Sequence, residues 1–180
     1  MIAKPDSVRI ATQADERPLY DLLMDLWTYG EERGLGWPVD PILVLRHIEE
    51  GTRPNLATRS DPMDLRRAVH GVIDDPDTPD RIIASVGLFI DQVGWYTREM
   101  GVHELWFYVR GHARNSRHHE RALRDFAFWV RQELNKGTPQ PMPLISGFYY
   151  RGPRLAAMER LWQRLWGPTA EKVAALWWIE

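Results

Sequence analysis

Alternating or β-branched apolar runs mark the strands that this chain is expected to form. The stretch Ser7–Ala11 alternates polar residues with Val8 and Ile10, which predicts a short first strand. Two runs, Ala68–Ile73 and Ile82–Ile90, flank the sequence DDPDTPD, whose prolines and aspartates cannot lie inside a ladder, so they predict a hairpin. Three further strands are expected at Glu104–Val109, Leu144–Tyr149 and Ala175–Ile179.

Helical spacing of apolar residues begins directly after the first strand. The stripe comprises Leu19, Leu22, Leu23, Leu26 and Trp27. Thr12 or Asp15 is expected to cap this helix, because both side chains can accept a hydrogen bond from a first-turn amide. The helix is expected to stop before Gly30.

A second helix is marked by its start and stop signals. Asp40 is the expected N-cap, and Pro41 is the first helical residue, where a proline removes no intrahelical hydrogen bond. Leu45 and Ile48 are expected to face inward, and Gly51 is expected to end the helix.

Two further helices are expected in the second half of the chain. One is His118–Leu134, whose apolar stripe consists of Leu123, Phe126, Ala127, Val130 and Leu134. The other runs from about Pro153 to Trp166. The predicted order is β-α-α-β-β-β-α-β-α-β, an α/β (α+β) arrangement in which a strand leads through a short basic loop into a helix.

Composition and charge narrow the classes of function. The chain has 180 residues, of which 44% are hydrophobic and 27% charged, so residues 1–180 are expected to form a single domain. A formal net charge of -2 argues against a nucleic-acid partner, which requires a strong basic footprint. The absence of cysteine excludes disulfides, thiolate zinc sites and cysteine nucleophiles.

The amino-terminal sequence and the hydropathy pattern indicate a location. The first residues, MIAKPDSVRI, lack the apolar core of a signal peptide. No later stretch approaches the roughly 20 apolar residues of a membrane-spanning helix. We therefore expect a cytoplasmic protein with no membrane partner.

Three local sequences carry a family resemblance. They are RIATQADERPLYDLL near the start, WFYVRGHARNSRHHERAL at the central strand-loop-helix, and LAAMERLWQRLWGP in the last predicted helix. Together they resemble the GNAT superfamily of N-acyltransferases over nearly the whole chain, and the central loop is closest to that of bacteriophage-encoded members. The resemblance implies the GNAT-like acyl-CoA N-acyltransferase fold, a mixed central sheet flanked by helices.

The same resemblance implies acyl transfer from CoA to an amine. Acetyl-CoA would be the co-substrate, and an amine-bearing small molecule or protein the acceptor. The cofactor-binding residues that it implies are Tyr108, Val109, Arg114, Asn115, Ser116, Arg117, His118 and His119. Amides at the start of the following helix would hold the CoA pyrophosphate, because unpaired N–H groups and the helix dipole favour an anion there.

The chain also departs from the family pattern. Arg117 and His119 replace two small residues of the loop, where a side chain can obstruct the approach of the backbone to a phosphate. Trp162 stands where many members have a tyrosine that protonates the thiolate, and an indole cannot act as a general acid. Two functions stay open: an active N-acetyltransferase, and a catalytically inactive, phage-associated structural or host-interaction protein with a virion partner.

Glu104 is the candidate catalytic residue. Alternation along its strand predicts that it shares a face with Trp106 and Tyr108. Such an aromatic setting would raise the pKa of the carboxyl and suit a general base. The alternative is a strand-end glutamate that faces water or pairs with an arginine.

The basic stretch around the loop has two interpretations. Its arginines are Arg110, Arg114, Arg117, Arg121 and Arg124, and they form either a phosphate cradle or a solvated helix face. Its histidines are His112, His118 and His119. Adjacent helical residues point in different directions, so we expect no metal site.

Tryptophans gather near the carboxyl end. Trp162 and Trp166 are four residues apart, which predicts one helical face and core packing. Trp177 and Trp178 should point to opposite faces of the last strand. A helix can cover one face, and a second copy of the chain or another protein is expected to cover the other.

Overall fold

The computed structural model describes residues 3–31, 39–53, 68–93, 97–146 and 155–167. The strands are β1 (Arg9–Ile10), β2 (Ala68–Asp74), β3 (Ile82–Gln92), β4 (Met100–Val109) and β5 (Leu144–Ile145). The helices are α1 (Glu16–Glu31), α2 (Pro41–Thr52), α3 (His118–Leu134) and α4 (Leu155–Trp166), with 3-10 helices η1 (Gln13–Asp15) and η2 (Gly111–Ser116). The expected strand Ala175–Ile179, with Trp177 and Trp178, lies outside the described residues.

The five strands form one mixed sheet in the order β1-β2-β3-β4-β5. Strands β1 to β4 pair antiparallel, and β5 pairs parallel with β4. The predicted hairpin of β2 and β3 is confirmed, as is the prediction that β3, β4 and β5 are neighbours. The predicted separation of β4 from β5 depends on residues 147–149, which lie outside the described part of the chain.

β2 and β3 run to Asp74 and Gln92, just past their predicted ends, and β1 and β4 differ more from their predictions. β1 is shorter than Ser7–Ala11, because only its two residues pair with β2. β4 begins at Met100, four residues before the predicted start, because Met100–His103 continue the ladder with β3. Glu104 therefore lies inside a strand and not at its end.

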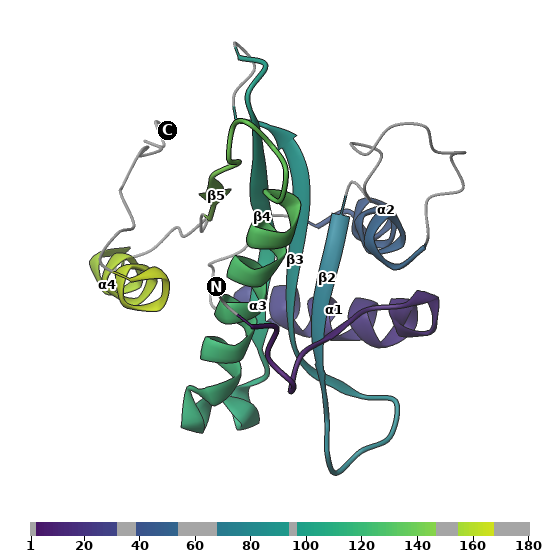
Figure 1. Ribbon diagram of the computed structural model, residues 1–180. Helices are drawn as coiled ribbons and strands as arrows, with labels where there is room; N and C mark the ends of the chain where they lie inside the picture. The colour runs from purple at the N-terminus through teal and green to yellow at the C-terminus, as the bar shows by residue number, and fades with distance from the viewer. Residues whose placement is uncertain (1–2, 32–38, 54–67, 94–96, 147–154, 168–180) are drawn as a thin grey trace, which may run out of the picture.

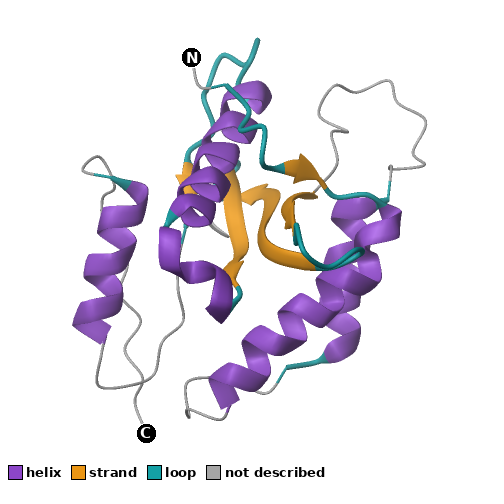
Figure 2. Cartoon of the chain, turned by 90° about the horizontal axis from the view of Figure 1, so that it is seen from below, coloured by secondary structure: helices purple, strands orange, loops and turns teal. Residues whose placement is uncertain are grey.

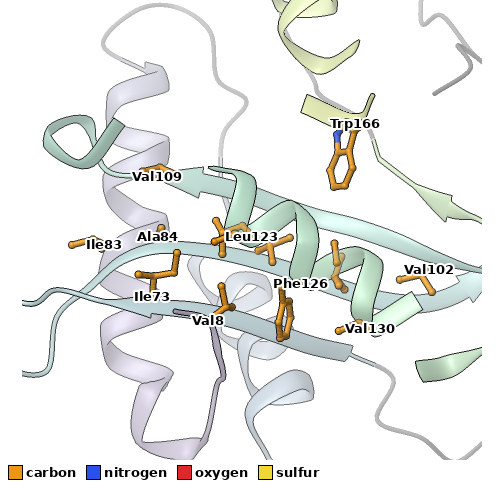
Figure 3. Packing of buried hydrophobic residues seen from close by; sticks show 14 of the residues in the cluster. Val8, Ile73, Ile83, Ala84, Val102, Val109, Leu123, Phe126, Val130 and Trp166 are labelled. Atoms are coloured by element: carbon orange, nitrogen blue, oxygen red, sulfur yellow. The ribbon is translucent and has the colours of Figure 1, made fainter. Parts of the chain in front are cut away.

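Helices cover both faces of the sheet (Figures 1 and 2). On one face α3 directs Leu123, Phe126 and Val130 at the strands (Figure 3). The approach is closest at Gly71, where an added Cβ would lie 2.6 Å from the Phe126 ring. On the other face α1 and α2 pack against the sheet through a second buried cluster that includes Leu19, Leu22, Leu23, Val44 and Ile48. The apolar stripes predicted for α1 and α3 are thus the faces that these helices bury.

Two details of α2 differ from the prediction. Leu45 is exposed, and Val44 and Ile48, four residues apart, form the inward face. Gly51 does not end the helix, which continues to Thr52. It is buried against the ring of His70, whose Nε2 would lie 2.2 Å from an added Cβ. The glycine thus serves close packing and does not terminate the helix.

The end of α1 also differs from the prediction. The helix continues through Gly30 to Glu31. A glycine weakens a helix by about 1 kcal/mol relative to alanine but ends it only where it adopts a left-handed conformation. Among the described glycines, only Gly137 and Gly167 have positive φ. None of the described helices has the length and apolarity needed to cross a membrane.

The turn before α1 is held by the residues predicted to cap it. The amide and hydroxyl of Thr12 both donate to the carboxylate of Asp15, at 2.7 and 3.0 Å. Arg9 of β1 donates to Asp15 and, through its other edge, to Asp74 of β2. This cluster ties the start of α1 to the edge of the sheet.

Candidate active site

Strand β4 carries a β-bulge at Leu105. Gly87 of β3 pairs with Trp106, but the next residue, Leu88, pairs with Glu104, so Leu105 is one residue in excess. An extra residue reverses the alternation of side chains between the two faces and bends the strand. The bulge lies directly beside the candidate base.

The bulge overturns the expected face of Glu104. Trp106 and Tyr108 pack into the cluster of α1 and α2. Val102, two residues before Glu104, and Phe107, beyond the bulge, pack into the cluster of α3. Glu104 lies on this second face. There it accepts a hydrogen bond from Ser146, which accepts one from Trp162 of α4. The prediction that it shares a face with Trp106 and Tyr108 is wrong, because strict alternation does not survive an extra residue.

Glu104 ends a chain of hydrogen bonds that joins three elements. Ser146, the residue after β5, donates its hydroxyl hydrogen to the Glu104 carboxylate. Trp162 of α4 donates its indole N–H to Ser146 Oγ at 2.8 Å. β4 and β5 run parallel, and Val102 pairs with Leu144. Two residues further along each strand, Ser146 therefore lies beside Glu104.

The electrostatics of Glu104 suit proton transfer. Burial raises its pKa to about 7, and the hydrogen bond from Ser146 opposes that rise. Among the described residues, no ion pair joins Glu104 to an arginine. A carboxyl group with this pKa can take up and release a proton near neutral pH, as a general base must.

Aromatic packing fixes α4 beside this site. The ring of Phe107 lies edge-on to Trp162 and to Trp166, with centroids 6.4 and 5.9 Å apart. Trp166 is buried and also contacts Phe128 of α3 at 5.8 Å. The prediction that Trp162 and Trp166 share a core-facing side of one helix is confirmed. This packing holds the Trp162 indole where it can donate to Ser146.

The predicted cofactor loop connects β4 to α3. Arg114, Asn115 and Ser116 belong to η2, and their side chains lie outside the described part of the chain. Arg117 is the N-cap of α3 and has a left-handed backbone, with φ 51° and ψ 4°. Glycine adopts this conformation without strain, whereas other residues disfavour it by roughly 1–2 kcal/mol. The chain therefore has a glycine-like backbone at a position where the sequence resemblance implies a small residue.

Two predicted cofactor residues form the first turn of α3. His118 is exposed, His119 is half-buried, and their ring centroids are 5.8 Å apart. Burial and the neighbouring His118 lower the pKa of His119. The His119 Nδ1 atom is buried without a hydrogen-bond partner among the described residues. Within the same residues, no cluster of histidine and acidic side chains could hold a metal ion.

The remaining predicted cofactor residues, Tyr108 and Val109, end β4. Their side chains are buried on opposite faces of the sheet. Ser85 and Ala84 of β3 pair with them. Their side chains thus belong to the two cores, which leaves the main chain as the part that a cofactor could contact.

The arginines of the basic run have two different roles. Arg110 pairs with Asp25 of α1, and Arg124 donates to a main-chain carbonyl of α4 at 3.3 Å. These two therefore join elements of the fold. Arg117 and Arg121 are exposed and one helical turn apart at the start of α3. They remain the candidate contacts for a phosphate.

Ser146 was not identified from the sequence as a site residue. It is the first polar residue inside the predicted strand Leu144–Tyr149, and it lies directly after the observed β5. A single serine in a strand carries no functional signal, and only the β4–β5 register places this hydroxyl against Glu104. Trp162 was identified as a departure from the family, but its hydrogen bond to Ser146 was not.

Comparisons with known proteins bear on the fold. No protein-family model matches this sequence, and no curated protein matches it. Solved structures do match. An aminoglycoside acetyltransferase from an uncultured soil metagenomic sample, in complex with sisomicin, is 9% identical with a TM-score of 0.55 and covers 96% of this chain and 94% of its own.

Two further acetyltransferase structures are similar. Glucosamine-6-phosphate N-acetyltransferase from Arabidopsis thaliana is 12% identical with a TM-score of 0.54, over 96% of this chain and 97% of that chain. Ribosomal-protein-alanine N-acetyltransferase from Brucella melitensis biovar Abortus 2308 is 12% identical with a TM-score of 0.54, over 96% and 99%. At such identities the likeness concerns the fold alone. The predicted fold is confirmed: the chain has the GNAT acyl-CoA N-acyltransferase fold.

Proposed function

We propose that this chain is a GNAT-like N-acyltransferase that moves an acetyl or other acyl group from CoA to an amine, with Glu104 as the general base. The fold supports the proposal, since its structural neighbours include enzymes named as N-acetyltransferases. We further propose that residues 1–180 act as one domain in the cytoplasm. The resemblance of the central loop to bacteriophage-encoded members supports a phage-encoded origin.

The placement of Glu104 is the observation that carries the proposal: its carboxyl lies on the central strand β4 and accepts a hydrogen bond from Ser146. Burial raises its pKa to about 7, near physiological pH, where a general base is most effective. In the proposed reaction the amine nitrogen attacks the thioester carbonyl and forms the C–N bond. The C–S bond breaks, the CoA thiolate leaves, and Glu104 accepts a proton from the amine.

The start of α3 supports a phosphate contact. A 3-10 conformation through Ser116 is followed by the left-handed Arg117, and such a pair of conformations turns successive N–H groups toward one point that suits an anion. Arg117 and Arg121 add exposed positive charge beside it. The strand from Glu104 to Val109 alone spans about 16 Å, and η2 lies between its end and this point.

Catalysis is tested with Glu104→Gln, which keeps the shape of the side chain but removes its basicity. We expect micromolar binding of acetyl-CoA by calorimetry for both proteins. Release of free thiol with a panel of amine acceptors should fall about 10²–10⁴-fold in the variant, the usual contribution of a general base. An unchanged rate would contradict the role of Glu104.

The phosphate contact is tested with two substitutions at one position. Arg117→Ala and Arg117→Gly both remove the guanidinium and should each weaken CoA binding roughly 10- to 100-fold, the range for a charge-assisted hydrogen bond. The glycine variant should also be about 1 kcal/mol more stable than the alanine variant, because it removes the left-handed strain. Equal CoA affinity in all three proteins would contradict the contact.

A catalytically inactive protein with the same fold would give a different set of results. Trp162 in place of a tyrosine and the two large loop residues favour it. If neither acetyl-CoA nor CoA gives heat or a thermal shift at millimolar concentration, the acyltransferase proposal fails. A structural or host-interaction role for the same fold would then be the better explanation.

A further inference from the structure

The indole of Trp162 fixes the direction of the hydrogen bonds around Ser146. An indole N–H donates and cannot accept, so Ser146 Oγ must be the acceptor of the 2.8 Å contact. A serine hydroxyl has one hydrogen to donate, and the partner of that hydrogen is Glu104 Oε2. The carboxylate oxygen is therefore held as a hydrogen-bond acceptor.

We propose that Trp162 and Ser146 form a one-way hydrogen-bond relay that holds the Glu104 carboxylate as a proton acceptor, which makes both of them positioning residues. This deepens the proposed function and rests on it for its catalytic meaning. Trp162 in this scheme donates no proton to a leaving group. It acts through Ser146, which it orients.

The chemistry of the indole explains why this position differs from a tyrosine. A phenol can donate or accept, so a tyrosine beside Ser146 would permit the serine hydrogen to turn away from Glu104. Edge-on contacts with Phe107 hold the Trp162 ring, so its N–H keeps one direction. Tryptophan in place of tyrosine therefore removes a possible proton donor and fixes the direction of the hydrogen bond to Glu104.

The hydrogen bond from Ser146 is the principal polar contact of Glu104 among the described residues. Opposite Glu104 on β3 lies the apolar Leu88. The described titratable groups of the packed elements are Asp91 on β3, His103 and Tyr108 on β4, His118, His119, Glu120, Arg121, Arg124, Asp125, Arg131 and Glu133 on α3, and Glu159, Arg160 and Arg164 on α4. Arg124 and Arg131 donate to main-chain carbonyls. None of these groups contributes to the pKa of Glu104, which depends on burial and on the Ser146 hydrogen bond.

The test measures the ionisation of Glu104 directly, without any substrate. The side-chain carboxyl carbons of ¹³C-labelled glutamate are titrated by NMR in the full chain, and Glu104→Gln assigns the resonance. The variants are Ser146→Ala, Ser146→Thr, Trp162→Phe and Trp166→Phe. Trp166→Phe is the matched control, because the Trp166 indole lies one turn further on α4 and its N–H has no acceptor among the described residues.

The relay predicts a graded set of shifts. Ser146→Ala should raise the pKa of Glu104 by about one to two units, the shift expected when a hydrogen bond to a charged group is lost. Ser146→Thr keeps the hydroxyl and should stay near the wild-type value. Trp162→Phe should raise the pKa by less than Ser146→Ala does, because the serine hydroxyl stays in place but can then rotate. Trp166→Phe should leave it unchanged.

Two results would overturn the relay. One is a Glu104 pKa in Ser146→Ala that equals or falls below that of the wild type. The other is an equal shift in Trp162→Phe and Trp166→Phe, since both remove an indole from α4. Should Ser146→Ala fail to fold, judged by circular dichroism, the comparison of Trp162→Phe with Trp166→Phe decides alone.

The relay and the acyltransferase proposal fail in different ways. Absence of acetyl-CoA turnover together with the predicted pKa shifts would remove the enzyme and leave the relay intact. Turnover with unshifted pKa values would remove the relay and leave the enzyme. If both hold, the pH at which kcat/KM is half-maximal should move up with the Glu104 pKa in Ser146→Ala, whereas a merely structural defect would lower the rate without moving the profile.

Discussion

Two ionisable residues, the buried His70 and the half-buried Glu104, lie on opposite faces of the same sheet, and desolvation shifts their pKa values in opposite directions. His70 of β2 faces α2, and burial lowers its pKa to about 4. Glu104 of β4 faces α3 and α4, and burial raises its pKa to about 7. Desolvation favours the neutral form of both, but only one of them then titrates near physiological pH.

The surroundings of the two residues explain the different consequences. His70 is completely buried, stacks on Trp106 with centroids 4.5 Å apart, and its Nε2–H donates to the carbonyl of His47 at 2.9 Å. This fixes a neutral imidazole in the core. Glu104 lies at the end of the β4–β5 ladder and bonds to Ser146. A buried ionisable group therefore indicates function only where its neighbours also let protons reach it.

The largest expected effect concerns the pH dependence of stability due to His70. Its folded pKa lies below the unfolded value of 6.5, so the unfolded state binds the proton first as pH falls. The free energy of unfolding should drop by about 2 kcal/mol between pH 7 and pH 4.5 through this residue alone. Urea unfolding of His70→Gln should lack that part of the decrease, and the exposed His112→Gln should retain it. Parallel pH curves for His70→Gln and wild type would contradict the neutral assignment.

Glu104 should show the opposite sign and a smaller magnitude. Its folded pKa is raised, so stability is lost as pH rises from about 4.5 to 7. The free energy of unfolding of Glu104→Gln should therefore be about 1–2 kcal/mol higher than that of wild type at pH 8. This value is reduced for the partial exposure of the carboxylate. The two proteins should have equal stability at pH 4. A variant that is less stable at pH 8 would show that ionised Glu104 stabilises the fold.

The smallest effect tests the packing that keeps His70 neutral. Gly51→Ala would place a Cβ 2.2 Å from His70 Nε2. The imidazole ring also packs against Trp106 and has little room to move away. Overpacking typically costs 1–3 kcal/mol, and the better helix propensity of alanine returns about 1, so a net loss of about 1 kcal/mol is expected. Gly111→Ala is the control, since nothing lies within 4 Å of its added Cβ. Equal thermal midpoints for both variants would refute the tight contact.

Local patterns were sufficient to predict the main elements. β-branched runs identified β2 and β3, an aromatic-rich run identified β4, and the stripe containing Leu123, Phe126 and Val130 identified α3 and the face it buries. These patterns depend only on each residue and its near neighbours in the sequence, so they can be recognised before the fold is known. The strand-loop-helix at the centre followed from the same patterns.

Local residue patterns define the order of elements, the apolar faces of α1 and α3, and the place of the Glu104 carboxyl on a central strand. The face and the hydrogen-bond partner of Glu104 depend on contacts between segments that are distant in the sequence. The bulge at Leu105 and the register of β4 with β5 arise from pairing between distant segments, and one extra residue moves a side chain to the other face. Helix packing then brought Trp162 to Ser146, a contact between residues sixteen positions apart that no local pattern encodes.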